Sequence, residues 1–84
     1  MSKRTYIDYI KDIVDELERI KEFVRGMSYQ DFVNDIKKIY AVIRCFEIIG
    51  EAVKKLPEEL KKKYPHIPWK KISGMRDKLI HSYF

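Results

Sequence analysis

Three side chains near the C-terminal end of this 84-residue chain have the types and spacing that suit cleavage of an RNA phosphodiester bond: Arg76, His81 and Tyr83. Arginine is a permanent cation whose forked donors match a phosphate group. Histidine can transfer protons near neutral pH, because its unperturbed pKa is about 6.5. Chemistry of this kind needs no metal ion, so we expect neither a metal nor a cofactor.

The spacing of these residues sets a geometric problem. On a continuous helix, residues five apart point about 140° away from each other and lie about 7.5 Å apart along the axis, so Arg76 and His81 would not share a face. Fraying of the helix after Ile80 would let His81 swing toward Arg76. The alternative is an arginine that pairs with a neighbouring helix and a histidine that packs on a helix end. Tyr83 could stack on nucleic-acid bases or lie at the edge of the core.

Three acidic residues could support this group. Glu47 and Glu51 are one turn apart, with Gly50 between them at a position where a large side chain would keep another helix away. Either glutamate could pair with Arg76, since a buried carboxylate needs a partner; exposure to solvent is the alternative for both. Asp77 could orient Arg76 or His81, or be a surface carboxylate without a role.

The positive charge of the chain is concentrated in its last third. Residues 1–53 hold nine basic and ten acidic residues, whereas residues 54–84 hold nine basic and three acidic residues, out of a net charge of +5. A localised positive field attracts polyanions such as nucleic acids. A solvated lysine-rich helix face explains the same charge, and residues 61–63 fit either interpretation. We expect three lysines of this part to bind RNA: Lys70, Lys71 and Lys78.

The apolar periodicity predicts an all-α fold in a single domain, residues 1–84. The expected helices cover residues 3–25, Ser28 to about Leu56, residues 58–64 and residues 69–80. The two long helices should pack as an antiparallel hairpin with the last helix lying across it. The second long helix is apolar on more than one face, so part of its surface must be covered by a partner subunit or by a further helix.

The size and composition of the chain limit its class. A domain this small buries a modest fraction of its surface, which makes dimerisation a reasonable expectation. The sequence contains no apolar run long enough to span a bilayer and no secretory signal. The single Cys45 cannot form an internal disulfide. We therefore predict a cytoplasmic protein that does not bind membranes.

Three segments together resemble the HepT-like branch of the HEPN superfamily over essentially the whole chain: residues 44–60, 64–69 and 72–84. The family motif is an arginine, a polar residue, three further residues and a histidine, and Arg76, Asp77 and His81 match it. Proteins of this family are all-helical endoribonucleases. Many are toxins encoded beside a minimal nucleotidyltransferase antitoxin, in type VII-like toxin–antitoxin systems.

The resemblance implies roles for the motif residues. The catalytic groups of two subunits converge at a homodimer interface, where His81 would be the general acid or base and Arg76 would bind the scissile phosphate of an RNA, with tRNA among the candidate substrates. Tyr83 matches the tyrosine to which the antitoxin transfers AMP. The alternative is a non-catalytic HEPN module that binds nucleotide or a nucleotidyltransferase. The family normally continues into a further helix beyond the position of Phe84, where this chain ends.

Overall fold

The computed structural model describes residues 4–84, and every regular element in this part of the chain is a helix. The all-α prediction is therefore confirmed. Within residues 4–84, none of the helices combines the length and the apolar character that crossing a membrane requires. The elements in chain order are α1 (Tyr6–Phe23), α2 (Tyr29–Val33), α3 (Ile36–Lys55), α4 (Glu58–Lys63), α5 (Trp69–Ser73) and α6 (Met75–Tyr83).

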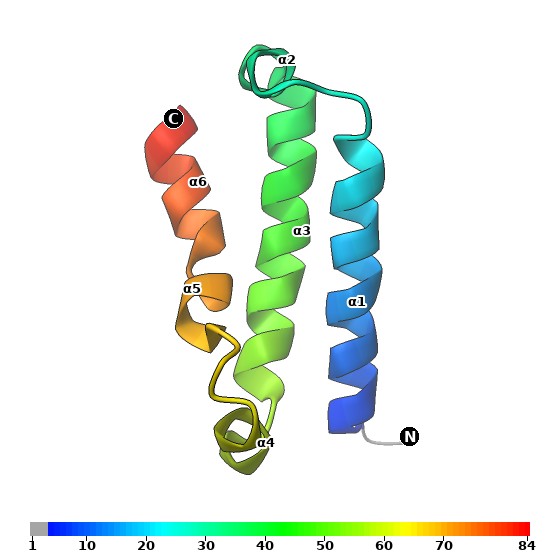
Figure 1. Cartoon of the computed structure of the whole chain (residues 1–84), viewed down its shortest axis with the longest axis vertical. Helices are drawn as coiled ribbons and strands as arrows, with labels where there is room; N and C mark the ends of the chain where they lie inside the picture. The colour runs from blue at the N-terminus through cyan, green and yellow to red at the C-terminus, as the bar shows by residue number, and fades with distance from the viewer. Residues whose placement is uncertain (1–3) are drawn as a thin grey trace.

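Helix α3 is the centre of the molecule. Helix α1 packs antiparallel along one side of it, which confirms the predicted hairpin, and α5 and α6 pack along another side (Figure 1). The prediction that the last helix lies across the hairpin is wrong, because α5 and α6 run alongside α3 in the opposite direction. Helices α5 and α6 lie along α3 because α3 is apolar on more than one face, and it buries residues against α1 on one side and against α5 and α6 on another. The turn between α1 and α2 contains Gly26 in the left-handed region, with φ of 72°.

The single helix predicted from Ser28 to Leu56 is wrong, because the structure divides it into α2 and α3. The Ser28 hydroxyl accepts a hydrogen bond from the backbone N–H of Asp31 (3.0 Å) and so begins α2. The Asp35 carboxylate accepts from the backbone N–H of Lys38 (3.1 Å) and begins α3 in the same way. Aspartate is a strong N-cap because its side chain satisfies an otherwise unpaired donor. This second helix start lies inside an uninterrupted apolar pattern, which concealed it.

The helix predicted over residues 69–80 is also two helices, α5 and α6, which meet at Gly74. Glycine is a poor residue for the interior of a helix. Helix α6 then continues to Tyr83, and the backbone N–H of Phe84 donates to the carbonyl of Ile80 at 2.9 Å. The helix does not fray after Ile80, so the condition under which His81 could swing toward Arg76 is not met, and His81 remains part of the helix.

Within residues 4–84, the core contains one buried carboxylate among apolar side chains. Glu16 of α1 is buried and forms an ion pair with Arg19, which offsets the cost of removing its charge from water. Burial, with a hydrogen bond to Glu16, raises the pKa of Cys45 to about 11. In the described part of the chain, the buried apolar residues come from α3 or its end: Ile39, Val42, Ile43, Cys45, Ile49, Ala52, Val53 and Leu56.

The close packing of α5 on α3 depends on Gly50. A Cβ atom at this position would lie 3.2 Å from the backbone oxygen of Ser73. We expect Gly50→Leu to lower the free energy of unfolding by about 1–3 kcal/mol, since the added side chain would push α5 away from α3. Urea denaturation followed by circular dichroism measures this loss.

The control is Glu51→Leu, which adds the same side chain one position later, where the native side chain is 71% exposed. This variant should change the free energy of unfolding by no more than about 0.5 kcal/mol. If the two variants lose the same free energy of unfolding, the contact between Gly50 and Ser73 does not determine how closely α5 packs on α3.

Some apolar surface remains open, as expected for so small a domain. Ile36 and Tyr40 at the start of α3 are exposed, and the Tyr40 ring lies 5.0 Å from the ring of Phe84. A second exposed stripe lies on α1 and was not expected, because the periodicity of that helix predicts a single buried face. Its members are Ile7, Ile10, Val14 and Leu17.

Candidate active site

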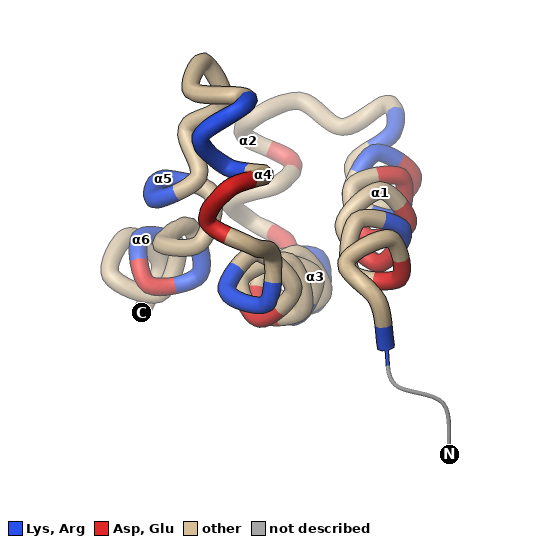
Figure 2. Tube along the Cα trace, turned by 90° about the horizontal axis from the view of Figure 1, so that it is seen from below, with Lys and Arg blue, Asp and Glu red and all other residues tan. Residues whose placement is uncertain are grey.

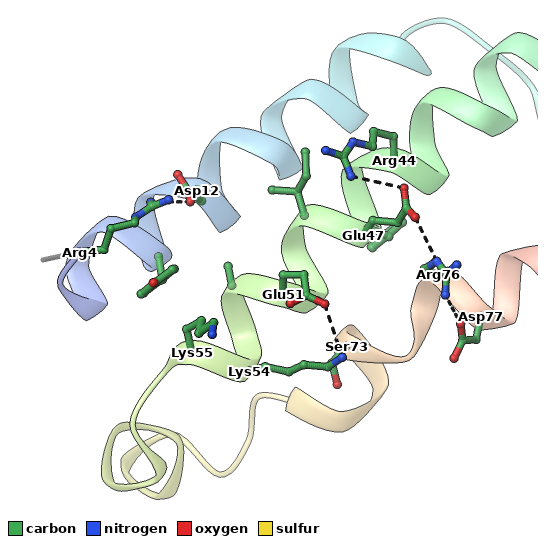
Figure 3. Close-up of a pocket in the computed structure, with 15 residues that line it drawn as sticks. Arg4, Asp12, Arg44, Glu47, Glu51, Lys54, Lys55, Ser73, Arg76 and Asp77 are labelled. Atoms are coloured by element: carbon green, nitrogen blue, oxygen red, sulfur yellow. Dashed lines mark hydrogen bonds and ion pairs between the residues drawn. The ribbon is translucent and has the colours of Figure 1, made fainter.

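Arg76 lies in the first turn of α6 and connects this helix to α3. Its Nε donates to Oε2 of Glu47 at 3.2 Å, and its Nη1 donates to Oδ1 of Asp77 at 3.0 Å (Figure 3). The second oxygen of Glu47 lies 3.6 Å from Nη1 of Arg44, so this carboxylate lies between two arginines. The Arg76 side chain is still 46% exposed. These contacts hold a guanidinium group in place while leaving it accessible to a ligand.

The structure separates the roles of the three acidic residues. Glu47 pairs with Arg76, as the sequence suggested for one of the two glutamates. Glu51 instead pairs with Lys54 on its own helix, at 3.7 Å, and is mostly exposed. Asp77 accepts a hydrogen bond from Arg76, and no hydrogen bond between Asp77 and His81 occurs in the described part of the chain. Among residues 4–84, no three His, Cys, Asp or Glu side chains lie close enough together to hold a metal ion.

His81 lies in the last turn of α6 and is exposed. Because α6 is continuous from Met75 to Tyr83, the angle between Arg76 and His81 around the helix axis is about 140°. A surface hollow of about 540 Å³ is lined by Arg76, Glu47 and Arg44, and His81 is not part of its wall. One chain therefore brings Arg76 and Glu47 together and leaves His81 on a different face.

Tyr83 lies at the edge of the core, which was one of the two interpretations of its position. Its ring packs edge-on against Phe32, with 6.0 Å between the ring centroids. A hydrogen bond with Tyr29 and the loss of contact with water raise the pKa of Tyr83. Tyr29 is itself 71% exposed.

The three lysines expected to bind RNA are all exposed. Lys70 and Lys71 belong to α5, and Lys78 belongs to α6. Seen from below in Figure 2, Lys and Arg segments lie on α4, α5, α6 and the end of α3.

Sequence reasoning missed Arg44, which contacts the same carboxylate as Arg76. The signal that could have found it is the spacing of three residues between Arg44 and Glu47, which places them one above the other on a helix. It also missed Ser73, whose backbone packs against Gly50 and which lines the hollow beside Arg76.

These features match a known family of helical proteins. The family described as "Ribonuclease HepT-like" matches residues 13–84, and the chain belongs to it. The resemblance to the HepT-like branch of the HEPN superfamily is thereby confirmed.

Several curated relatives cover the chain almost completely. Over its full length the chain is 50% identical to a Methanocaldococcus jannaschii protein named as a candidate RNase, of which it covers 69%. It is 50% identical over 82 residues, which are 98% of this chain and 74% of the relative, to a protein of Thermococcus cleftensis named "Probable ribonuclease HepT". A candidate RNase of Caldanaerobacter subterraneus is 53% identical over 76 residues, or 90% of this chain and 68% of the relative. No solved structure matches this chain.

Proposed function

We propose that this protein is a single-domain, metal-independent endoribonuclease whose active site forms between two copies of the chain. The observation that carries the proposal is the arrangement of Arg76 and His81. Arg76 is held by Glu47 in an accessible position, while His81 is exposed on another face of the same helix. Membership of the ribonuclease HepT-like family, and relatives named as ribonucleases, support RNA as the substrate.

Arg76 and His81 suit cleavage by intramolecular phosphoryl transfer, in which the ribose 2′-hydroxyl of the RNA attacks the adjacent phosphate. His81 takes the proton of the ribose 2′-hydroxyl, and the 2′-oxygen then forms a bond to the adjacent phosphorus. The bond from phosphorus to the 5′-oxygen of the next nucleotide breaks, and that oxygen receives a proton from a histidinium or from water. Arg76 binds the phosphate and stabilises the charge that develops on its oxygens. The products are a 2′,3′-cyclic phosphate and a 5′-hydroxyl.

An exposed apolar patch beside His81 supports the homodimer. Phe84 follows His81 by three residues, and its ring contacts that of Tyr40 on α3. Ile36, one turn before Tyr40, extends the patch, and all three side chains are exposed in the single chain. Apolar surface of this kind is typical of an interface. A second copy bound here would bring its own α6 close to His81.

RNA cleavage in a chelator tests the proposed reaction. The full chain should cut total RNA in the presence of EDTA, because neither Arg76 nor His81 needs a metal ion to act. Denaturing gel electrophoresis shows the fragments, and phosphatase resistance of their 3′ ends identifies the cyclic phosphate. Cleavage that occurs only after a divalent metal is added would contradict the mechanism.

The proposal includes control by a minimal nucleotidyltransferase antitoxin, in a type VII-like toxin–antitoxin pair. The Tyr83 oxygen would attack the α-phosphorus of ATP, forming a bond to AMP and releasing pyrophosphate, while the phenol proton passes to a base. Tyr83 is two residues from His81, in the last turn of α6. A bulky anion at this position would repel the RNA backbone.

Incubation with the cognate nucleotidyltransferase and ATP should add the mass of one AMP group to the Tyr83 peptide and stop RNA cleavage. Peptide mass spectrometry locates the group, and a gel assay follows the activity. Tyr83→Phe is the control, since it lacks the acceptor oxygen and should stay active and unmodified. An unchanged Tyr83 peptide in the active protein would rule out this form of control.

Three exposed lysines complete the proposed site by holding the RNA backbone: Lys70, Lys71 and Lys78.

The alternative is a non-catalytic module that binds nucleotide or a nucleotidyltransferase. The pairing of Arg76 with both Glu47 and Asp77 favours this alternative, because two carboxylates offset the positive charge that a phosphate needs. The chelator experiment separates the two, since the non-catalytic module cuts no RNA.

A further inference from the structure

A second hollow, apart from Arg76 and His81, lies between the end of α3, α4 and α5. Its volume is about 430 Å³, and four lysines and one glutamate line it. We call it the lysine hollow. Figure 2 looks at this end of the molecule and shows the positive segments of α3, α4 and α5 gathered there. The four lysines are Lys54, Lys61, Lys62 and Lys70.

The lysine hollow has a fixed shape. The indole N–H of Trp69, at the start of α5, lies 3.2 Å from the backbone oxygens of both Lys61 and Tyr64. These contacts attach the beginning of α5 to the end of α4. The Lys61 side chain is only 17% exposed, and its ammonium lies 3.4 Å from the Glu58 carboxylate. The walls therefore belong to helices that are hydrogen-bonded to each other.

The charge of the lysine hollow suits a polyanion. Two carboxylates pair with lysines of the hollow, Glu58 with Lys61 and Glu51 with Lys54, so its four ammonium groups still carry an excess of positive charge that a ligand can use. Ammonium groups attract phosphates as point charges and do not read base sequence. A nucleic-acid backbone supplies such phosphates at regular intervals.

The lysine hollow adjoins the proposed active site. Lys54 and Ser73 line both the lysine hollow and the larger hollow that contains Arg76. Gly50 permits this arrangement, because the backbone of Ser73 lies directly against it. A strand bound at Arg76 can therefore continue over Ser73 into the lysine hollow.

We infer that the lysine hollow is an anchoring site for the RNA backbone, which binds phosphates next to the one that is cut. This inference rests on the proposed function, since the bound strand is the substrate. It predicts that long RNAs bind more tightly than short ones. A dinucleotide at Arg76 has one phosphodiester and so has no phosphate left for the lysine hollow.

The test compares a Lys61→Gln/Lys62→Gln variant with a Lys11→Gln/Lys21→Gln control. Both lose two positive charges, but Lys11 and Lys21 lie on α1, which does not line the lysine hollow. Fluorescence anisotropy with a labelled single-stranded RNA of about 20 nucleotides gives the Kd at several salt concentrations. A dinucleotide cleavage assay gives the rate at the active site alone, and thermal melting checks that each variant is folded.

The Lys61→Gln/Lys62→Gln variant should bind the long RNA about tenfold more weakly than the control near 0.1 M salt. The slope of log K against log salt concentration should become less steep by about 1.4, which is about 0.7 for each lost phosphate contact. Its dinucleotide cleavage rate should equal that of the native chain. If the Lys61→Gln/Lys62→Gln variant and the control have equal Kd values and equal salt slopes, the anchoring site is wrong. It is also wrong if the variant binds RNA as the control does and loses only the binding of a nucleotidyltransferase. If the native chain cuts neither RNA yet the Kd difference is present, the anchoring site stands and the proposed catalysis fails.

Discussion

His81→Ala is expected to lower the rate of RNA cleavage by about 10²- to 10⁴-fold, the usual contribution of a general acid or base. The structure should survive this change, because His81 is exposed in the last turn of α6. Substitution of an exposed surface side chain usually changes the free energy of unfolding by no more than about 0.5 kcal/mol, and we expect no larger loss here. Initial rates on a fluorescent RNA and a thermal melt measure the two effects.

His66 provides the control for this variant. It is also exposed and lies in the turn between α4 and α5. The centroid of its ring is 6.2 Å from that of the Tyr64 ring. His66→Ala should keep the native cleavage rate. If both variants are as active as the native chain, His81 does not transfer the proton and the catalytic assignment is wrong.

Arg76→Ala is expected to lower the cleavage rate by about 10²- to 10³-fold, as found when a donor to a developing oxyanion is removed. Arg76→Lys should recover little of this loss, because an ammonium lacks the forked donors of arginine. The free energy of unfolding should fall by no more than about 1 kcal/mol, since the ion pair with Glu47 is partly exposed and Glu47 keeps its contact with Arg44. Single-turnover rates at saturating RNA separate this loss from weaker binding.

Arg25→Ala is the matched control, because Arg25 also forms an ion pair on the surface, with Glu22 at 2.8 Å, in the turn that follows α1. It should cut RNA at the native rate. A normal rate in Arg76→Ala would mean that the guanidinium held by Glu47 has a structural role, and the non-catalytic alternative would then account better for the chain.

The sequence predicted the fold well where the apolar pattern is regular. The spacing of three and four residues along the two long helices predicted the hairpin of α1 and α3, and Gly50 marked the close approach of another element. The errors fall at Asp35 and Gly74, where a cap and a flexible residue divide a helix without interrupting its apolar pattern. The direction of α5 and α6 was also wrong, because periodicity shows which face is buried and does not show the angle between helices.

The candidate site could be predicted only in part. A carboxylate partner for Arg76 was expected, but the choice of Glu47 over Glu51 depends on where α6 lies against α3, which spacing along the chain does not specify. Arg44 was missed because its role depends on Glu47. The relation between Arg76 and His81 is a different case, because in the proposed composite site they act across two chains, and such pairs leave no spacing signal within one chain.

The most direct test of the composite site mixes two inactive variants. If Arg76 of one copy acts with His81 of the other, a dimer of Arg76→Ala and His81→Ala contains one intact site. Mixing the two variants, with native mass spectrometry to confirm that mixed dimers form, should restore up to about half of the native cleavage rate per mixed dimer. Mixed dimers that are no more active than either variant alone would contradict the composite site.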